Sequence, residues 1–297
     1  MTARIGLIDV DSHNFPNLAL MKISAFHKNK GDAVEWWNGL LTYDRVYKSR
    51  VFTDLYSEDI EYCINADEVI KGGTGYDLKN KLPEEIEHQF PDYDLYKIKD
   101  RAYGFLTRGC PRGCPFCIVK EKEGGVHTVA DLSEFWSGQK EIMLMDSNIT
   151  ASKDCERLFN QLIDSKALIN FEGGLDIRFL TEKGASQINQ MKTSMIHFAW
   201  DNYEFYTYEK LKRFRPMFKA DGRRLRVYVL TNFATTHEQD IERITKLREL
   251  DYDPYVMVYN KPKAPKQTKQ LQRWCNNKVI YRSVERFEEY CTSGGGR

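Results

Sequence analysis

The first part of the chain alternates short apolar segments with one amphipathic segment. Residues 4–9 form a short apolar run, which predicts a strand. Residues 17–28 repeat apolar positions with helical spacing, as at Leu18 and Met21, and follow Pro16. Further strands are predicted at residues 33–36, 45–51 and 68–71. The pattern therefore predicts a small, open, Rossmann-like α/β domain at the start of the chain.

The second part of the chain repeats a unit in which an apolar run precedes a helical pattern. Six strands are predicted, at residues 103–107, 141–145, 170–172, 195–199, 226–231 and 254–259. The clearest helix spans residues 236–250, with Thr235 and Glu238 as a capping box. Strands that alternate with helices form parallel sheets. Six such units predict a partial (β/α)6 TIM-like barrel, in which reactive groups lie at the carboxyl ends of the strands.

A polar segment that contains Pro83 and Pro91 separates these two parts and predicts a connection between domains. We place the boundary near residue 98. The predicted fold class is therefore α/β, with three parts. They are an α/β domain with its connecting segment at residues 1–98, the barrel at 99–265, and a C-terminal helix and tail at 266–297.

Composition and charge narrow the classes of protein. The 297 residues include 44 Lys or Arg and 43 Asp or Glu, so no overall field draws the protein to nucleic acid or to an anionic membrane. The first residues lack a signal-peptide pattern, and no apolar run of about 18 residues is long enough to span a bilayer. We expect a cytoplasmic protein with no membrane contact. In that reducing compartment, its seven cysteines are expected to be ligands or core residues.

Three cysteines directly follow the first predicted barrel strand. Residues 107–120 read TRGCPRGCPFCIVK, so Cys110, Cys114 and Cys117 have the spacing C-x3-C-x2-C. A closed zinc site requires a fourth Cys or His ligand, and none is nearby in the sequence. A four-iron cluster held by three thiolates leaves one iron open to a ligand that is not protein. The spacing favours such a cluster, with a zinc or redox loop as the alternative.

This spacing, with Phe116 before the last cysteine, resembles the signature of the radical S-adenosylmethionine (radical SAM) superfamily. The resemblance implies a [4Fe-4S] cluster whose open iron binds S-adenosylmethionine, and an electron donor such as flavodoxin or ferredoxin. It further implies reductive cleavage of the cofactor to a 5'-deoxyadenosyl radical, while the protein supplies positioning and exclusion of solvent. The expected function is a radical SAM enzyme that modifies an unidentified substrate, with group transfer as the expected reaction.

The resemblance implies cofactor contacts at Phe116, Asp146, Ser147, Asn148, Asp176, Arg178 and Asn232, and a substrate pocket at His197, Trp200, Asp201 and Tyr259. Phe116 is expected to flank the adenine. Residues 146–148 stand where the family has a Gly-Gly-Glu-like element, and the glycines are missing here. Arg178 is expected to pair with the cofactor carboxylate, with a strand-end salt bridge as the alternative. Packing is the alternative role for the residues of the substrate pocket.

The first domain resembles the cobalamin-binding-like domain that precedes the barrel in one branch of this superfamily. Asp11, His13 and Pro16 resemble the Asp-x-His-x-x-Gly motif of cobalamin proteins, except that proline replaces glycine. We therefore expect no cobalamin. Methylthiotransferases carry three cluster-binding cysteines in this domain, and Cys63 is the only candidate here. The remaining cysteines, Cys63, Cys155, Cys275 and Cys291, show no C-x2-C pairing and predict no second cluster.

Two basic runs in the sequence are compatible with a nucleic-acid partner. One contains Lys212, Arg213, Arg215, Arg223, Arg224 and Arg226, and the other spans residues 261–273. A solvated helix face is the alternative for both, and a peptide or a small metabolite is the alternative substrate. Two rival functions are a cobalamin-dependent radical SAM methyltransferase and a non-enzymatic zinc-binding nucleic-acid module.

Overall fold

A computed structural model describes residues 2–12, 15–54, 56–59 and 63–292, with the side chains of residues 291 and 292 excepted. The N-terminal sheet has four parallel strands in the order β2-β1-β3-β4. These strands are β1 (Arg4–Asp9), β2 (Ala33–Trp36), β3 (Tyr43–Ser49) and β4 (Ala66–Gly72). Helix α1 (Leu18–Asn29) packs Leu20 and Ile23 against Ile5 and Leu7 of β1. The predicted strands and helix of this part are therefore present.

The segment that connects the two parts of the chain packs against both of them. It contains α2 (Glu84–Glu87) and the 3-10 helix η1 (Tyr93–Tyr96). The buried hydroxyl of Tyr93 donates to the carbonyl of Phe135 at 2.6 Å and accepts from the amide of Tyr103 at 2.9 Å. Met21 of α1 belongs to the same hydrophobic core as these residues. The connection is thus packed structure, and the boundary near residue 98 stays a prediction.

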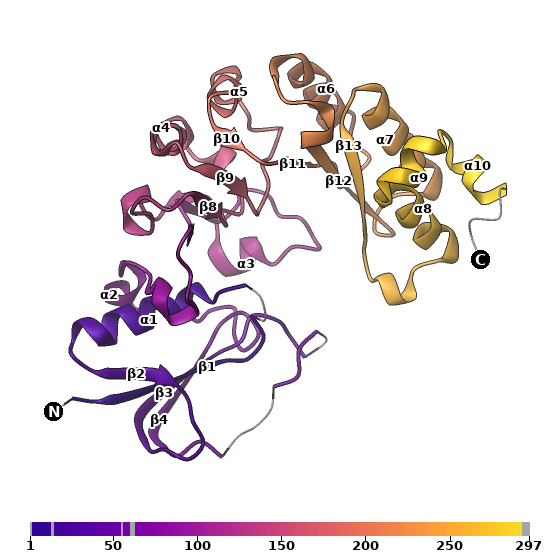
Figure 1. The fold of residues 1–297 in the computed structure, drawn as a ribbon. Helices are drawn as coiled ribbons and strands as arrows, with labels where there is room; N and C mark the ends of the chain where they lie inside the picture. Colours follow the sequence, from indigo (N-terminus) through magenta and orange to yellow (C-terminus); the bar gives the residue numbers. More distant parts are fainter. Residues whose placement is uncertain (1, 13–14, 55, 60–62, 293–297) are drawn as a thin grey trace.

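The six predicted strands of the second part lie in two parallel sheets (Figure 1). One sheet has the order β10-β9-β8-β5, with β5 (Arg101–Gly104), β8 (Glu141–Leu144), β9 (Leu168–Phe171) and β10 (Lys192–Thr193). The other has the order β11-β12-β13, with β11 (Ile196–Ala199), β12 (Leu225–Thr231) and β13 (Asp253–Val258). A single sheet was expected. The ladder is interrupted after β10, which pairs only with Leu168 and Ile169 of β9, and the amide of Leu175 donates to the carbonyl of His197 (2.7 Å) beyond the interruption.

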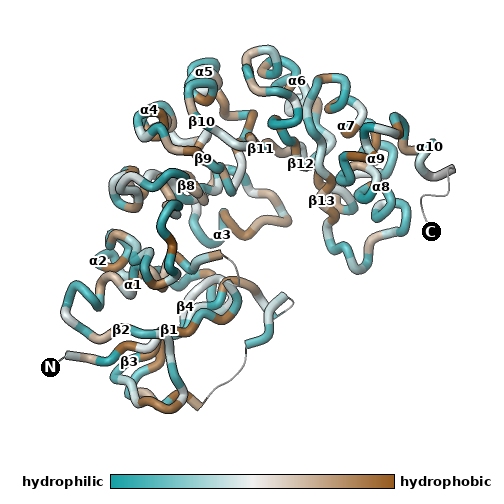
Figure 2. Tube along the Cα trace, viewed as in Figure 1, coloured by the Kyte–Doolittle hydropathy of each residue, from teal (hydrophilic) through white to brown (hydrophobic). Residues whose placement is uncertain are grey.

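Helices connect these strands on the outer side of the arc that Figure 1 shows. They are α4 (Cys155–Ser165), α5 (Glu182–Ile188), α6 (Phe205–Phe214) and α7 (His237–Glu249). Figure 2 shows hydrophilic positions along these outer helices with hydrophobic positions among them. Short 3-10 turns occur at η2 (Leu132–Glu134), η3 (Ile149–Ala151), η4 (Arg215–Met217) and η5 (Gly222–Arg224). One continuous core, which includes Leu158, Phe198 and Val227, lies between helices and strands.

The N-terminal cap of α7 differs from the expected one by one residue. The capping box is formed by Thr236 and Gln239, not by Thr235 and Glu238. Thr235 instead donates its hydroxyl to the buried carboxylate of Asp240 at 2.6 Å. Asp240 therefore takes Thr235 out of the capping position, and the helix begins one residue later.

Three further helices follow η6 (Lys261–Lys263) and cover the last strand. They are α8 (Lys266–Asn276), α9 (Lys278–Ser283) and α10 (Phe287–Thr292). Trp274 and Leu271 of α8 pack with Val256 of β13 in a separate small core. No helix in the described ranges is long and apolar enough to cross a bilayer.

Candidate functional site

The cysteine loop is held by a short antiparallel hairpin that the sequence did not predict. Strand β6 (Thr107–Arg108) pairs with β7 (His127–Thr128), and the loop and α3 (Val119–Glu123) lie between them. The expected strand at 103–107 is divided, because β5 ends at Gly104 and β6 begins at Thr107. A Cβ at Gly104 would lie 2.3 Å from the ring of Phe135, so this turn requires glycine.

The loop closes on itself through backbone contacts. The amide of Cys110 donates to the carbonyl of Gly124 at 3.1 Å, and the amide of Cys117 donates to that of Cys114 at 3.0 Å. Gly109 has φ +82°, and a Cβ there would lie 2.3 Å from the carbonyl oxygen of Gly125. Only glycine fits this close approach. The two ends of the loop are therefore fixed, and the three cysteines lie between them.

The three thiols of the loop differ in exposure. Cys110 and Cys114 are half-buried and Cys117 is exposed. Burial raises the pKa of the Cys114 thiol, Arg112 lowers it, and the other two cysteines raise it again, so the three groups influence one another. In the part of the chain that the structure describes, no three His, Cys, Asp or Glu side chains form a preassembled metal site. The assignment of these three cysteines to a cluster therefore stays a prediction from their spacing.

Asp146, at the end of β8, holds the base of the cysteine loop. Its carboxylate accepts from the amide of Leu106 (3.0 Å), from the amide of Thr107, and from the Thr107 hydroxyl (2.6 Å). Only 2% of the residue is exposed, and burial raises its pKa to about 6. Asp146 was expected to contact the cofactor. Its carboxylate is used by the backbone of the loop, which makes it a positioning residue.

Glu123, at the end of α3, holds the other side of the loop. Its carboxylate accepts from the amide of Gly109 at 2.9 Å and from the hydroxyl of Ser147 at 3.3 Å, and it pairs with Arg108 at 3.1 Å. Ser147 was predicted at the site, whereas Glu123 and Arg108 were not. The sequence signal was only that both residues flank the cysteine loop.

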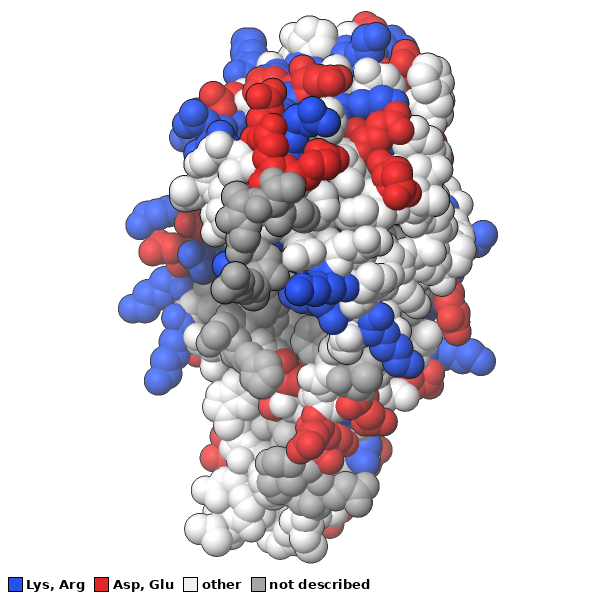
Figure 3. All heavy atoms as spheres, turned by 90° about the vertical axis from the view of Figure 1, so that its right-hand side faces the viewer, with Lys and Arg blue, Asp and Glu red and all other residues white. Residues whose placement is uncertain are grey.

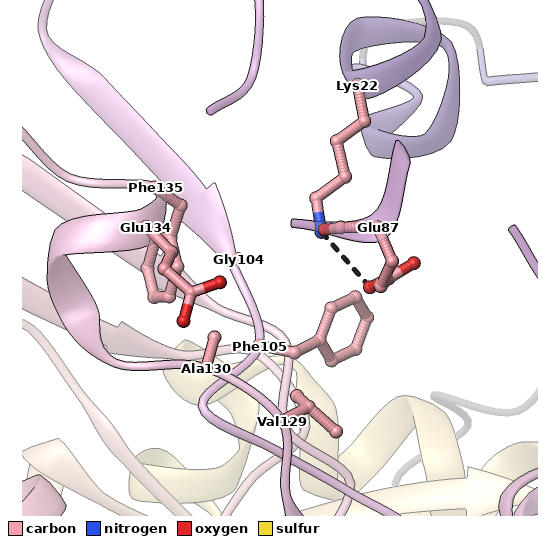
Figure 4. A pocket seen from close by; sticks show the side chains of 8 residues that line it. All are labelled: Lys22, Glu87, Gly104, Phe105, Val129, Ala130, Glu134 and Phe135. Carbon is pink, nitrogen blue, oxygen red and sulfur yellow. Dashed lines mark hydrogen bonds and ion pairs between the residues drawn. The ribbon is translucent and has the colours of Figure 1, made fainter. Parts of the chain in front are cut away.

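A chain of ion pairs continues from Arg108 into the N-terminal domain. Arg108 pairs with Glu87 at 3.3 Å, and Glu87 pairs with Lys22 of α1 at 3.0 Å. Figure 4 shows Lys22 and Glu87 beside Phe105, around a cavity of about 10 Å³. The guanidinium of Arg108 lies over the ring of Phe105, 4.0 Å from its centroid. The N-terminal domain is thereby joined to the cysteine loop.

A second contact joins the loop helix to the far edge of the N-terminal sheet. The ammonium of Lys122 donates to the hydroxyl of Thr74, in the glycine turn after β4. In this turn Gly73 has φ +98°, and a Cβ would lie 2.2 Å from the carbonyl oxygen of Arg50. The carboxyl end of β4 therefore lies beside the cysteine loop. His13 lies outside the described residues.

Asn148, Asp176 and Arg178 form one cluster next to the first cysteine. The amide nitrogen of Asn148 lies 3.3 Å from the Cys110 sulfur and 3.3 Å from the Asp176 carboxylate. Arg178 donates to both oxygens of Asp176, from Nε at 2.6 Å and from Nη2 at 3.0 Å. The three predicted residues are brought together at Cys110. Arg178 forms the strand-end salt bridge that was its alternative role.

Carboxylates lie around Arg112 of the cysteine loop. Arg112, within the cysteine loop, lies 4.0 Å from Asp176 and 3.8 Å from Glu204. Asp201 follows β11, and burial raises its pKa, with Arg112 opposing the shift. Glu204 was not predicted. This part of the site is therefore polar and charged. It contains Arg112, Arg178, Asp176, Asp201 and Glu204, and the two ion pairs of Arg112 are long.

Aromatic rings form another side of the site. Phe116 packs edge-to-face on Phe233, with ring centroids 5.3 Å apart, and Phe233 packs on Tyr259 at 4.9 Å. Asn232 has φ 60°, and its side chain donates to the carbonyl of Tyr259 at 2.8 Å. Phe116, Asn232 and Tyr259 were predicted at the site. Phe233, which joins them, was missed because a lone aromatic after a strand carries no spacing signal.

The other two predicted pocket residues pack within the fold. Trp200 is 2% exposed, belongs to the main core, and stacks on Tyr208 with centroids 5.8 Å apart. His197 stacks on Tyr228 at 5.3 Å, and burial lowers its pKa. Both side chains are less exposed than Tyr259, of which 43% is exposed.

A larger groove of about 520 Å³ lies away from the cysteine loop, at the amino ends of β5 and β8, where Arg101 and Glu141 line it.

The described cysteines outside the loop differ in burial. Cys63 is exposed, Cys155 is half-buried and Cys275 is buried. Burial raises the pKa of both Cys155 and Cys275 to about 12, which keeps these thiols protonated. The side chain of Cys291 lies outside the described residues.

Burial of Asp176 predicts a pH effect on stability. Burial raises its pKa from 3.8 to about 6, so the folded protein binds this proton more tightly than the unfolded chain does. The free energy of unfolding should therefore fall as the pH rises through this interval, by at most about 1.4 kcal/mol per pH unit. Asp176→Asn is expected to flatten that slope in urea unfolding. The exposed Asp164→Asn serves as control, and an unchanged slope in Asp176→Asn would contradict the assignment.

The fold places the three thiols after the carboxyl ends of parallel strands. Two solved structures share this fold, both of the radical SAM methyltransferase TsrM from Kitasatospora setae. The first, with cobalamin and a [4Fe-4S] cluster bound, has a TM-score of 0.65 and 12% identity, and covers 87% of this chain and 75% of that chain. The second, with tryptophan substrate and aza-SAM bound, has a TM-score of 0.64 and 10% identity, and covers 86% and 73%.

No family model and no curated protein sequence matches the chain. At 12% identity the likeness establishes the fold, and it confirms the predicted resemblance to radical SAM proteins at that level. The expectation that no cobalamin is used is contrary to the first neighbour, which binds it.

Proposed function

We propose that the protein is a radical SAM enzyme in which Cys110, Cys114 and Cys117 hold a [4Fe-4S] cluster. The observation that carries this proposal is three thiols on one loop that is fixed at the carboxyl ends of parallel strands. When bound, such a cluster with S-adenosylmethionine supplies one-electron reductive cleavage of the cofactor, fed by a donor such as flavodoxin or ferredoxin.

The residues around the cysteine loop are expected to have different roles. Asp146 and Glu123 hold its two sides, so the thiols are positioned by buried carboxylates. The edge-to-face rings of Phe116, Phe233 and Tyr259 make one side of the site apolar, and the ring of Phe116 is expected to flank an adenine. The side-chain amide nitrogen of Asn148, at 3.3 Å from the sulfur of Cys110, can donate a hydrogen bond to that sulfur or to the carboxylate of a bound ligand. Asp176 and Asp201 suit a ligand amine, because an ammonium is stabilised beside carboxylates.

The test is formation of 5'-deoxyadenosine by the full-length protein. After anaerobic reconstitution with iron and sulfide and reduction with dithionite, we expect the product in the parent and in Cys63→Ala. We expect none in Cys110→Ala, Cys114→Ala or Cys117→Ala, each with reduced iron content. Stoichiometric zinc in protein purified without oxygen, or a full cluster without cofactor cleavage under any reductant, would contradict the proposal.

A second candidate is a cobalamin-dependent radical SAM methyltransferase. The contact of Lys122 with Thr74 supports it, because the glycine turn of the N-terminal sheet lies beside the cysteine loop. The cobalamin bound to the first structural neighbour supports it as well. Co-elution of hydroxocobalamin with the full chain on gel filtration would favour this candidate, and a corrinoid-free protein peak would remove it.

A further inference from the structure

Charge is unevenly distributed near the end of the chain. Residues 254–284 contain seven Lys or Arg and no Asp or Glu, although the whole chain has 44 of the former and 43 of the latter. A segment of this kind has no acidic neighbours of its own to neutralise it. Whether it is an ordinary solvated face depends on what the fold places around it.

The structure distinguishes the two basic runs of the sequence. In the first run the arginines are used within the fold. Arg213 pairs with Glu182, Arg215 with Asp251 and Arg226 with Asp253, and Arg224 donates to the carbonyls of Thr193 and Ser194. This run therefore stabilises the barrel helices and strands and has few free cations to offer.

The second run remains available. Its exposed residues on η6, α8 and α9 form a patch, which we call the basic strip: Lys261, Lys263, Lys266, Lys269, Arg273 and Arg282. Lys278, the seventh basic residue, pairs with Asp253 at 2.7 Å. Among the described residues no carboxylate lies within ion-pair distance of the basic strip, although other cations form the pairs reported above.

Figure 3 faces the side of the molecule on which these helices lie. Lys and Arg side chains project around the middle of this face, while several Asp and Glu side chains gather toward its top. Cations without a carboxylate partner raise the local concentration of a polyanion. The face is therefore suited to a long anionic ligand.

The basic strip begins beside the aromatic side of the site. Tyr259 is 43% exposed and stands two residues before Lys261. Its ring contacts Phe233, which contacts Phe116, the residue before Cys117. A row of rings thus leads from the basic strip to the cysteine loop. An exposed ring, here Tyr259, next to a line of cations is the kind of surface on which proteins bind single-stranded nucleic acid.

We propose that the substrate is a single-stranded nucleic acid segment, which places its phosphates on the basic strip and a base against Tyr259 and Phe233. This inference rests on the proposed function, because it names the substrate class of the same site. An acidic peptide would be attracted by the cations but has no bases to stack on the rings. The rings therefore favour nucleic acid.

The test measures binding of a fluorescein-labelled oligonucleotide of about 12 nucleotides to the reconstituted full-length protein. RNA and DNA of the same sequence are compared by fluorescence anisotropy at several salt concentrations. Lys266→Ala/Lys269→Ala/Arg273→Ala should lower the slope of log K against log salt by about 2, because each lost phosphate contact contributes about 0.7. Tyr259→Leu should weaken binding about tenfold without changing that slope.

A matched triple variant separates strip binding from overall charge. Lys153→Ala/Lys192→Ala/Lys212→Ala removes the same charge from exposed positions elsewhere, and it should bind like the parent. Equal loss in both triple variants, no binding by the parent, or equal competition by poly-glutamate would overturn the inference. Thermal unfolding confirms that each variant is folded. Cofactor cleavage without oligonucleotide binding would leave the proposed function standing and remove only this substrate class.

Discussion

Replacing Arg243 with leucine is expected to lower the free energy of unfolding by about 3–5 kcal/mol. Arg243 is fully buried on α7 and pairs with the buried carboxylate of Asp240 at 2.6 Å. It also donates to the carbonyl of Leu230 at 2.7 Å and to the carbonyl of Trp200. The substitution leaves a buried carboxylate without its counter-charge and two strand-end carbonyls without a donor. Urea unfolding of the full chain measures the effect.

The control for this prediction is an arginine whose ion pair is exposed. Arg213 is 57% exposed and pairs with Glu182 at 2.7 Å. Arg213→Leu should change stability by less than about 1 kcal/mol, since exposed ion pairs contribute little. The prediction is contradicted if the free energy of unfolding of Arg243→Leu also lies within about 1 kcal/mol of the parent's, as expected for the control. The buried ion pair would then contribute no more to stability than an exposed one. Because Asp201 and Asn232 are near these carbonyls in sequence, Arg243→Leu should also disturb the site.

Asp146→Ala is expected to cost about 2–6 kcal/mol and to reduce the iron bound after reconstitution. The substitution leaves the amides of Leu106 and Thr107 buried without an acceptor, and each such donor costs about 1–3 kcal/mol. Because these residues begin the hairpin that carries the cysteines, the thiols should lose their fixed position. Iron content and the electron paramagnetic resonance spectrum of the reduced protein report this loss independently of activity.

Two variants make this result specific. Asp146→Asn keeps the shape and one acceptor oxygen, and should recover part of the stability and of the iron content. Ser147→Ala removes only one hydroxyl at 3.3 Å from Glu123, so it should behave almost like the parent. A full cluster in Asp146→Ala with an unchanged spectrum would show that the loop does not depend on this carboxylate.

Local patterns predicted the elements, and contacts distant in sequence decided the rest. Period and turn residues were sufficient for β1 and β2, whose expected bounds are those observed. The interruption between β9 and β11 follows β10, a two-residue strand too short to show a pattern. The cap of α7 moved to Thr236 because Thr235 bonds to Asp240 across the turn, which a capping-box pattern does not reveal.

The site shows the same division. The spacing of the three cysteines is a local signal, and it marked the loop directly. Phe233 and Arg108 could not be found in this way, because their roles arise from a ring contact with Phe116 and an ion pair with Glu87. Trp200 was expected in a pocket and lies in the core, since strand position alone does not say which face a residue occupies.

The ion pairs that run from Lys22 through Glu87 and Arg108 to Glu123 make the two halves of the molecule thermodynamically linked. A ligand that moves α1 relative to the hairpin must alter these pairs, and so it changes the stability of the loop. Linkage is reciprocal. Loading the loop should therefore change, by the same factor, the affinity with which the N-terminal domain holds any ligand of its own, so each half acts as a sensor of the other's occupancy.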